Sequence, residues 1–353
     1  MIQTITMVQD SQDTTRMTTA PPTDNDPPPQ MITPNEDSDG DAGTTSPPRF
    51  IDLFCGMGGF HLALKTLATC VYACDNDRFA CKTYEANFGV SPQGDITAVS
   101  AADIPPHDLL CAGFPCQSFS TIGRREGFDH PTKGTLFFDI ARILAHHQPA
   151  ACFLENVKGL LSHDRGQTFA VVRSTLQQLG YHLHVKVLDA ADFGLPAHRK
   201  RVYIVGFRAA AVDFTWPTPT HQGNHVGIGP FLEQHDTGYC IYPQTQRYLF
   251  KKDDGRPRIV TPETTHPANT LVATYHKVQR LTGTFVKDGA TGYRLLSSNE
   301  CKAMLGFPSG FQIPTSRTQM YRQLGNSVAV PVVRAIAQQI CRVLPPPQGN
   351  PEA

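Results

Sequence analysis

The sequence FIDLFCGMGGFHLALKTL occupies residues 50–67 and carries the signals of a strand, a turn and a helix in succession. Residues 50–54 are a short, mainly apolar run typical of a buried strand, and the leucines that follow the turn indicate a helix. The glycines of the turn let a ligand approach the backbone closely. A third glycine of the dinucleotide pattern, counted from Gly56, would fall at His61, so a pyrophosphate is not the expected ligand.

The next predicted strand, residues 71–74, ends at Asp75, which lies 23 residues after Asp52. Nucleotide-binding folds place the carboxylate that binds ribose hydroxyls at about this distance. A ribose without phosphates suggests S-adenosylmethionine as the ligand. Asp75 is equally suited to cap a helix that begins near Arg78, so the prediction depends on the spacing.

A third apolar run, residues 109–112, leads into the sequence GFPCQSFS at residues 113–120. Cys116 is therefore expected in a loop just beyond the carboxyl end of a strand, where α/β folds bind ligands. Pro115 fixes its own φ and favours an extended Phe114, which would direct the thiol. Taken alone, Cys116 also fits a half-buried structural cysteine.

A fourth apolar run, residues 151–154, ends at Glu155 and Asn156. The carboxyl ends of parallel strands meet at one edge of a sheet, so Glu155, Cys116 and the glycine turn are expected to face the same place. Further elements continue the alternation and are expected at residues 136–147, 167–179 and 182–188. The predicted fold class is α/β, with a Rossmann-like, doubly wound parallel sheet.

Three further features are candidates for binding. Residues 199–205 alternate so that Arg199, Arg201 and Tyr203 share one face, which suits an anion, although a surface salt bridge is the alternative. Asp95 would either contact an adenine or cap a turn. The basic, glycine-containing loop at residues 123–134 would either close over a phosphate backbone or be a solvated loop.

Composition divides the chain into five segments. Residues 1–48 are rich in Thr, Asp and Pro and predict a disordered acidic tail. A main domain (49–215) follows, then a smaller domain of mostly β or irregular structure (216–318), a helical return to the main domain (319–343) and a loose tail (344–353). After about residue 212 helices are not expected until a helical signal returns at residues 298–305, and the β-like pieces are residues 258–260 and 270–274.

The charge distribution and the cysteine spacing indicate which partners and metals to expect. The formal net charge is zero overall, but residues 1–48 carry −7 and the remaining chain +7, which fits a polyanionic partner. The ten cysteines lack zinc-site spacing and are expected to be reduced, and no metal is expected. Neither an export signal nor a membrane span is recognisable, so a cytoplasmic protein is expected.

Taken together, these residues resemble the DNA (cytosine-5)-methyltransferase family, most closely its small bacterial HhaI-type restriction-modification members. Six matches occur in the family's order between residue 50 and about residue 340: FCGMGG (54–59), GFPCQSFS (113–120), ENV (155–157), Arg199 with Arg201, Arg294 with Glu300 and LGFP (305–308), and GNSV (325–328). The resemblance to the HhaI type is strongest at residues 84–89 and 134–143. Two departures affect local contacts: Ala197 replaces the family's glutamine, and Asn76 replaces an aromatic residue that often stacks on adenine.

The resemblance implies a mechanism. Cys116 would add to C6 of a flipped-out cytosine, Glu155 would protonate or hydrogen-bond N3, and Arg201 would hold O2. The remaining catalytic residues carried over from the family are Pro115 and Asn156. The methyl donor would be S-adenosylmethionine, and the smaller domain would recognise a specific duplex sequence.

The resemblance also assigns binding residues. Those expected to surround the cofactor are Phe54, Gly56, Gly58, Gly59, Asp75, Asp95, Asn326 and Ser327. Those expected to contact DNA are Ser120, Arg124, Arg125, Arg199, Arg256, Arg258 and Thr270, with the segment 274–280 also near the grooves. The partner would be double-stranded DNA, and the enzyme would act as a monomer. A possible cognate restriction endonuclease would act on the same DNA sequence.

Two alternatives stay open. One branch of the family methylates transfer RNA, but its Cys-Phe-Thr signature in the target region is absent here. A catalytically inactive DNA-binding scaffold would be expected to lack the thiol or the carboxylate, and both Cys116 and Glu155 are present.

Overall fold

The structure is a computed structural model that describes residues 46–115, 136–234, 239–289 and 292–346. The strands within these ranges are β1 (Arg49–Leu53), β2 (Thr69–Cys74), β3 (Leu109–Gly113), β4 (Ala151–Val157), β5 (His182–Asp189), β6 (Lys200–Phe207), β7 (Arg258–Val260), β8 (Thr284–Asp288) and β9 (Gly292–Arg294). The α-helices are α1 (Gly59–Leu64), α2 (Arg78–Phe88), α3 (Leu136–His147), α4 (Gln167–Gln178), α5 (Pro243–Leu249), α6 (Ser298–Ala303), α7 (Arg317–Asn326) and α8 (Val330–Val343). The predicted acidic tail lies almost entirely outside the described residues.

The larger sheet has the strand order β2-β1-β3-β4-β6-β5. Strands β1 to β4 are parallel, as expected, but β6 runs antiparallel to both β4 and β5. The parallel arrangement expected for the strands that lead to the glycine turn, Cys116 and Glu155 is confirmed, and the reversal occurs at β6. Because of this reversal, the first residues of β6, and not its last, lie beside the carboxyl end of β4, with Val157 paired to Arg201.

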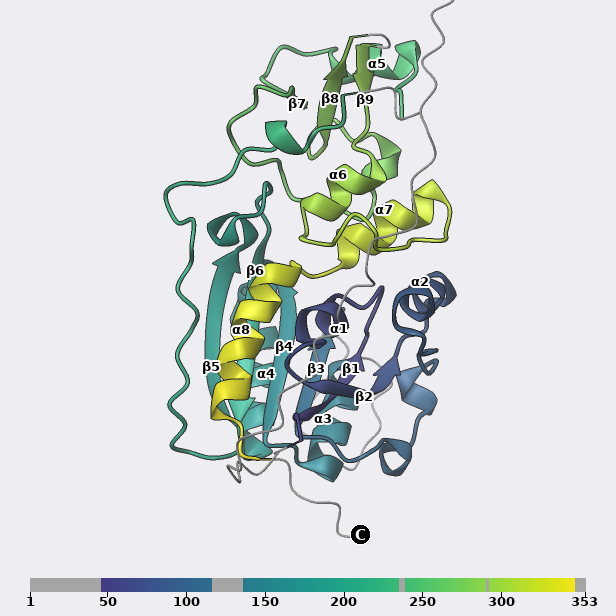
Figure 1. Ribbon diagram of the computed structural model, residues 1–353. Helices are drawn as coiled ribbons and strands as arrows, with labels where there is room; N and C mark the ends of the chain where they lie inside the picture. The colour runs from purple at the N-terminus through teal and green to yellow at the C-terminus, as the bar shows by residue number, and fades with distance from the viewer. Residues whose placement is uncertain (1–45, 116–135, 235–238, 290–291, 347–353) are drawn as a thin grey trace, which may run out of the picture. The chain divides into compact units, whose positions relative to one another are not determined.

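Side chains alternate across this sheet and supply a hydrophobic core on each face. Phe153 and Tyr203 belong to the core that includes residues of α1 and α8, whereas Leu154 and Ile204 belong to the core that includes residues of α3 and α4. Figure 1 shows α8 in front of the sheet and α3 and α4 behind it. Helices on both faces confirm the predicted doubly wound α/β class.

The smaller sheet has the order β7-β8-β9, with β7 parallel and β9 antiparallel to β8. The prediction of a strand at residues 258–260 is confirmed. Residues 270–274 form no strand; here the hydroxyl of Thr270 donates to the carbonyl of His198, and the carbonyl of Leu271 accepts from Arg199. Helix α5 was not expected; it begins with Pro243, which suits a first helical position, and buries only Leu249.

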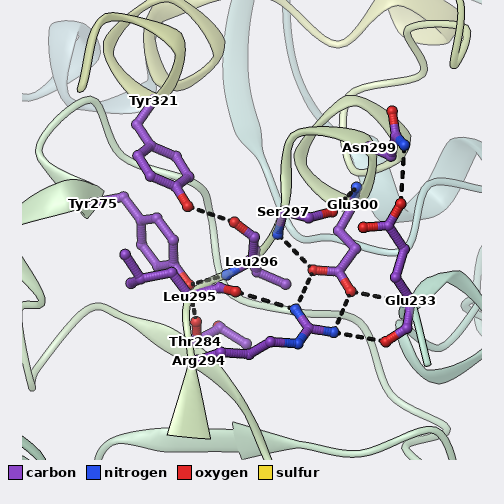
Figure 2. A network of polar contacts seen from close by, with 10 residues as sticks. All are labelled: Glu233, Tyr275, Thr284, Arg294, Leu295, Leu296, Ser297, Asn299, Glu300 and Tyr321. Carbon is purple, nitrogen blue, oxygen red and sulfur yellow. Dashed lines mark hydrogen bonds and ion pairs between the residues drawn. The ribbon is translucent and has the colours of Figure 1, made fainter. Parts of the chain in front are cut away.

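A buried ion pair joins β9 to α6 (Figure 2). The Arg294 guanidinium donates two hydrogen bonds to the Glu300 carboxylate, at 2.9 and 2.7 Å, and a third to the carbonyl of Glu233 at 2.8 Å. Glu300 is completely buried and also accepts from the backbone N–H of Ser297, whose hydroxyl in turn caps the helix at Glu300. The pair therefore connects three separate segments.

We expect Glu300→Ala to lower the free energy of unfolding by about 3–5 kcal/mol, because it leaves Arg294 charged and buried without its partner. Urea denaturation followed by circular dichroism measures the change. Glu233→Ala is the control: it removes the carboxylate that accepts from the exposed Asn299 amide but keeps the backbone carbonyl that accepts from Arg294. Its effect on the free energy of unfolding should be below about 1 kcal/mol. Equal effects for the two variants would contradict this account.

Candidate active site

A cavity of about 510 Å³ lies at the carboxyl edge of the larger sheet. It is bounded by the turn after β1, the ends of β2, β3 and β4, the beginning of β6 and the end of α7. Eleven of the residues expected at the site line it: Phe54, Gly56, Gly59, Asp75, Asp95, Pro115, Glu155, Arg199, Arg201, Asn326 and Ser327. The structure thus brings together residues that are far apart in the sequence, from Phe54 to Ser327.

The turn after β1 has an unusual backbone. Phe54 and Gly56 both have a φ of 54°, and Gly58 has a φ of 90°. A left-handed conformation is rare for phenylalanine, and such strain is concentrated at ligand sites. A Cβ on Gly59 would lie 2.7 Å from Cγ2 of Val328, so a glycine is required where the turn meets the segment between α7 and α8.

Asp75 holds this turn in place. Its two carboxylate oxygens accept the backbone N–H groups of Gly56 and Asp77, each at 2.8 Å. Burial raises the pKa of Asp75, and these two hydrogen bonds oppose the shift. The residue that caps α2 is Asp77, which accepts from the N–H of Phe79 at 2.9 Å. Asp75 is therefore free to present its remaining lone pairs to the cavity.

Of the two alternatives for Asp95, the turn cap is confirmed and the contact with adenine stays a prediction. One of its oxygens, Oδ1, accepts from the N–H and the hydroxyl of Thr97 and caps the short 3-10 helix Ile96–Ala98. These bonds lower the pKa of Asp95, which is exposed and also lines the cavity. The residue caps a turn and still offers Oδ2 to a ligand.

Glu155 lines the cavity together with Arg199 and Arg201. It occupies β4 beside Gly113 of β3, is 7% exposed, and has Oε1 3.0 Å from Nε of Arg201. Burial raises the pKa of Glu155, while Arg201 and Arg199 act in the opposite direction. A carboxyl group balanced in this way can hold a proton or share it with a ring nitrogen.

Asn156 supports the strand that leads to the thiol. Its amide donates to the carbonyl of Phe114 at 2.9 Å, and its side-chain oxygen accepts from the N–H of Val157. Asn156 does not line the cavity, but it fixes the backbone next to Pro115. Cys116 itself lies outside the described residues.

Arg199 is buried beside the start of β6. It is 2% exposed and donates to the carbonyls of Leu271, Gly325 and Ser327. Burial and the neighbouring Arg201 lower its pKa to about 10. An arginine used in this way connects the start of β6 to the end of α7; its expected contact with DNA stays a prediction.

Comparison with known proteins identifies the family of the chain. Residues 48–342 match the model of the C-5 cytosine-specific DNA methylase family. The chain belongs to this family. It is a DNA (cytosine-5)-methyltransferase, and the resemblance inferred from the six motifs is confirmed.

Relatives and solved structures agree with this assignment. The chain is 55% identical over 298 residues to the type II methyltransferase M.MspI of Moraxella sp, covering 84% of this chain and 71% of the relative. It is 40% identical over 312 residues to the type II methyltransferase M.HhaI of Haemophilus parahaemolyticus, covering 83% and 94%. The crystal structure of the S. pombe Dnmt2 methyltransferase superimposes with a TM-score of 0.67 at 23% identity, covering 83% of this chain and 98% of that one, which supports the fold.

Of the described residues expected to contact DNA, Arg199 lines the cavity of this methyltransferase, whereas Arg256, Arg258 and Thr270 do not. Ser120, Arg124 and Arg125 lie outside the described residues. Arg256 is exposed between α5 and β7, and Arg258 donates to the carbonyl of Pro267 at 3.1 Å. The Thr270 hydroxyl is engaged with the carbonyl of His198 at 2.6 Å. Within the described ranges, no group of three His, Cys, Asp or Glu side chains is arranged to hold a metal, and no helix is long and apolar enough to cross a membrane.

Several cavity residues of the enzyme were missed by sequence reasoning. Cys55 and Met57 lie in the glycine turn, and Arg322, Gln323 and Gly325 lie on α7. The signal for Arg322 and Gln323 was their helical spacing from Asn326, since positions three and four residues apart share a face; Gly325 directly precedes Asn326. The glycine turn was read for its backbone alone, so its side chains were not considered.

Asp52 is a buried carboxyl group behind the turn. It is completely buried in β1, and neither oxygen has a hydrogen-bond partner among the described residues. Burial raises its pKa well above the ordinary value, the nearby backbone N–H of His61 opposes the shift without reaching hydrogen-bond geometry, and Asp75 adds to it. The folded enzyme therefore favours the protonated form of Asp52 more strongly than the unfolded chain does.

This shift gives a prediction for stability. With the folded pKa above the unfolded one, the contribution of Asp52 is largest below the unfolded pKa and is lost as the pH rises towards the folded pKa. Asp52→Asn keeps the shape of the side chain but cannot ionise. As the pH rises from the unfolded to the folded pKa, the free energy of unfolding of this variant should therefore increase relative to that of the wild type, by up to about 1.4 kcal/mol per pH unit.

Urea denaturation at several pH values between 4 and 8 measures this difference. Asp253→Asn, at an exposed position, is the matched control for the removal of one carboxylate. A difference between Asp52→Asn and the wild type that stays constant across the pH range would contradict the prediction.

Proposed function

We propose that the enzyme transfers a methyl group from S-adenosylmethionine to C5 of a cytosine flipped out of a specific duplex sequence, with Cys116 as nucleophile. The observation that carries the proposal is the position of Glu155. This buried carboxyl group with a raised pKa faces the cavity next to Arg201 and pairs in register with Gly113, three residues before Cys116.

The cavity residues fit S-adenosylmethionine. The volume of about 510 Å³ is in the range of small-molecule sites. Asp75 offers carboxylate lone pairs to the two ribose hydroxyls, and Asp95 offers Oδ2 to an adenine amino group. The acidic lining also suits a ligand that carries a sulfonium and an ammonium group. When bound, this cofactor supplies an electrophilic methyl group.

The chemistry requires the protein to activate cytosine, because C5 is a poor nucleophile. The Cys116 thiolate adds to C6 and pushes the electrons of the C5–C6 double bond towards C5. Glu155 gives a proton or a strong hydrogen bond to N3, which absorbs the charge that the addition would otherwise leave on the ring. After C5 is methylated, loss of the C5 proton to a base re-forms the double bond and expels Cys116.

The arginines have separate tasks in this proposal. Arg201 reaches the cavity and would donate to the O2 of cytosine while keeping Glu155 oriented. Arg199 would support the site by holding the start of β6 against the end of α7. Asn326 and Ser327, at the end of α7, line the same cavity as Asp75 and would complete the cofactor site.

The nucleic-acid partner follows from the reaction. A base within a duplex cannot reach a thiol at a sheet edge, so the target cytosine must leave the stack at a cost of a few kcal/mol. The net charge of +7 on residues 49–353 favours a polyanion. The curated relatives are named type II methyltransferases, which supports a role beside a cognate restriction endonuclease. The proposal takes the enzyme to act as a monomer.

The proposal is tested with labelled S-adenosylmethionine, mixed-sequence duplex DNA and, separately, transfer RNA. We expect label at C5 of cytosine in DNA and its loss in Cys116→Ala. Label in transfer RNA alone would instead support an RNA enzyme, and DNA binding without transfer would support a scaffold.

We further expect Glu155→Gln to lower kcat by about 10²–10⁴-fold, the usual contribution of a general acid. Calorimetry with S-adenosylhomocysteine should give an affinity within about twofold of the wild type, because Asp75 and the glycine turn are untouched. A kcat close to that of the wild type would contradict the role given to Glu155.

A further inference from the structure

The loop between α5 and β7 is organised around an arginine from a later part of the chain. Arg280, which precedes β8, is 5% exposed in its side chain. Its Nε donates to the carbonyl of Leu249 at 2.8 Å, and its Nη2 donates to the carbonyls of Lys252 and Arg256 at 2.8 and 2.9 Å. One guanidinium thus holds both ends and the middle of the loop.

Asp254 completes the arrangement. Its carboxylate accepts from Nη1 of Arg280 at 2.9 Å and also from Nη2, while Oδ1 accepts from the backbone N–H of Arg256 at 3.1 Å. Only a planar group with five donors can satisfy this set of acceptors, so lysine is not an equivalent replacement. The expectation that segment 274–280 reaches the DNA grooves is therefore wrong for Arg280, which faces inward.

The backbone next to Arg280 is strained. Val278 has φ 53° and ψ 52°, a left-handed conformation that a β-branched residue rarely adopts. Its side chain packs against the hydrophobic core that includes residues of α1 and α8, and this contact fixes the turn in its conformation. Strain of this kind persists where the surrounding structure requires one geometry, and here it aims Arg280 at the loop.

The outer surface of the loop is basic and partly aromatic. Residues 251–256 are all exposed, including Lys251, Lys252 and Arg256. Residues 247–256 together with Arg280 carry a net charge of +3. Tyr248 is 52% exposed and has the Lys251 ammonium 4.5 Å from its ring centre.

We propose that residues 250–256 contact the sugar-phosphate backbone of duplex DNA and that Arg280 is the positioning residue that sets their geometry before DNA binds. This inference rests on the proposed function, because it assigns part of the DNA contact to a defined loop. Lysines make phosphate contacts as point charges, and a loop ordered in advance loses less entropy on binding. The exposed positive charge, not the buried arginine, meets the DNA.

The first experiment tests the contact. We expect Lys251→Ala/Lys252→Ala to weaken duplex binding about tenfold and to reduce the slope of log Kd against log salt by about 2, since each phosphate contact contributes about 0.9. Fluorescence anisotropy between 50 and 300 mM NaCl measures both. Lys65→Ala/Lys186→Ala removes two exposed lysines elsewhere and should leave the slope unchanged. An unchanged slope in the loop variant would overturn the proposal.

The second experiment tests positioning. Arg280→Lys should raise the KM for DNA five- to tenfold with kcat within about twofold and with S-adenosylhomocysteine affinity unchanged. Adding Lys251→Ala/Lys252→Ala to this variant should weaken binding little further, because both changes act through the same contact. Asp254→Asn, at an exposed position, should show the same effect more weakly and keeps the test valid if Arg280→Lys folds poorly.

Two outcomes distinguish the possible failures. Additive effects in the combined variant, or a lower Tm of Arg280→Lys or Asp254→Asn with no change in KM, would reduce Arg280 to a structural residue and overturn its positioning role. Absence of methyl transfer to DNA by the wild-type enzyme would overturn the proposed function itself, which the wild-type assay establishes first.

Discussion

The ion pair between Glu155 and Arg201 sets the geometry of the catalytic edge. It exists because β6 runs against β4, so that the residues at the start of one strand lie beside those at the end of the other. Burial favours the protonated form of Glu155, and the two arginines favour the charged form. The proton affinity of the group thus follows from the direction of a single strand, and a parallel β6 would have carried both arginines to the far edge of the sheet.

Buried arginines hold the described part of the enzyme together at three further points. Arg199 joins β6 to the end of α7, Arg294 joins β9 to α6 and to Glu233, and Arg280 shapes the loop before β7. Each one satisfies carbonyls or a carboxylate from segments distant in the sequence. In the proposed DNA contact the charge comes from exposed cations, whose removal does not require a buried group to lose its partner.

Periodicity predicted many elements closely but could not predict how they associate. The helix expected at residues 136–147 coincides with α3, because its apolar side chains recur at helical spacing and face the core. The direction of β6 was not predictable, since alternation is identical in parallel and antiparallel strands. Arg199 was grouped with the DNA contacts because a sequence shows a positive charge but not the carbonyls of Leu271 and Gly325 that surround it.

The most direct test of the account is covalent capture on DNA in which the target cytosine carries fluorine at C5. The proposed chemistry adds Cys116 to C6 and then requires the C5 substituent to leave as a cation, which fluorine cannot do. Mass spectrometry of the digested complex should therefore find the methylated oligonucleotide attached to the peptide that contains Cys116. Methyl transfer with no adduct, or an adduct on another cysteine, would contradict the account.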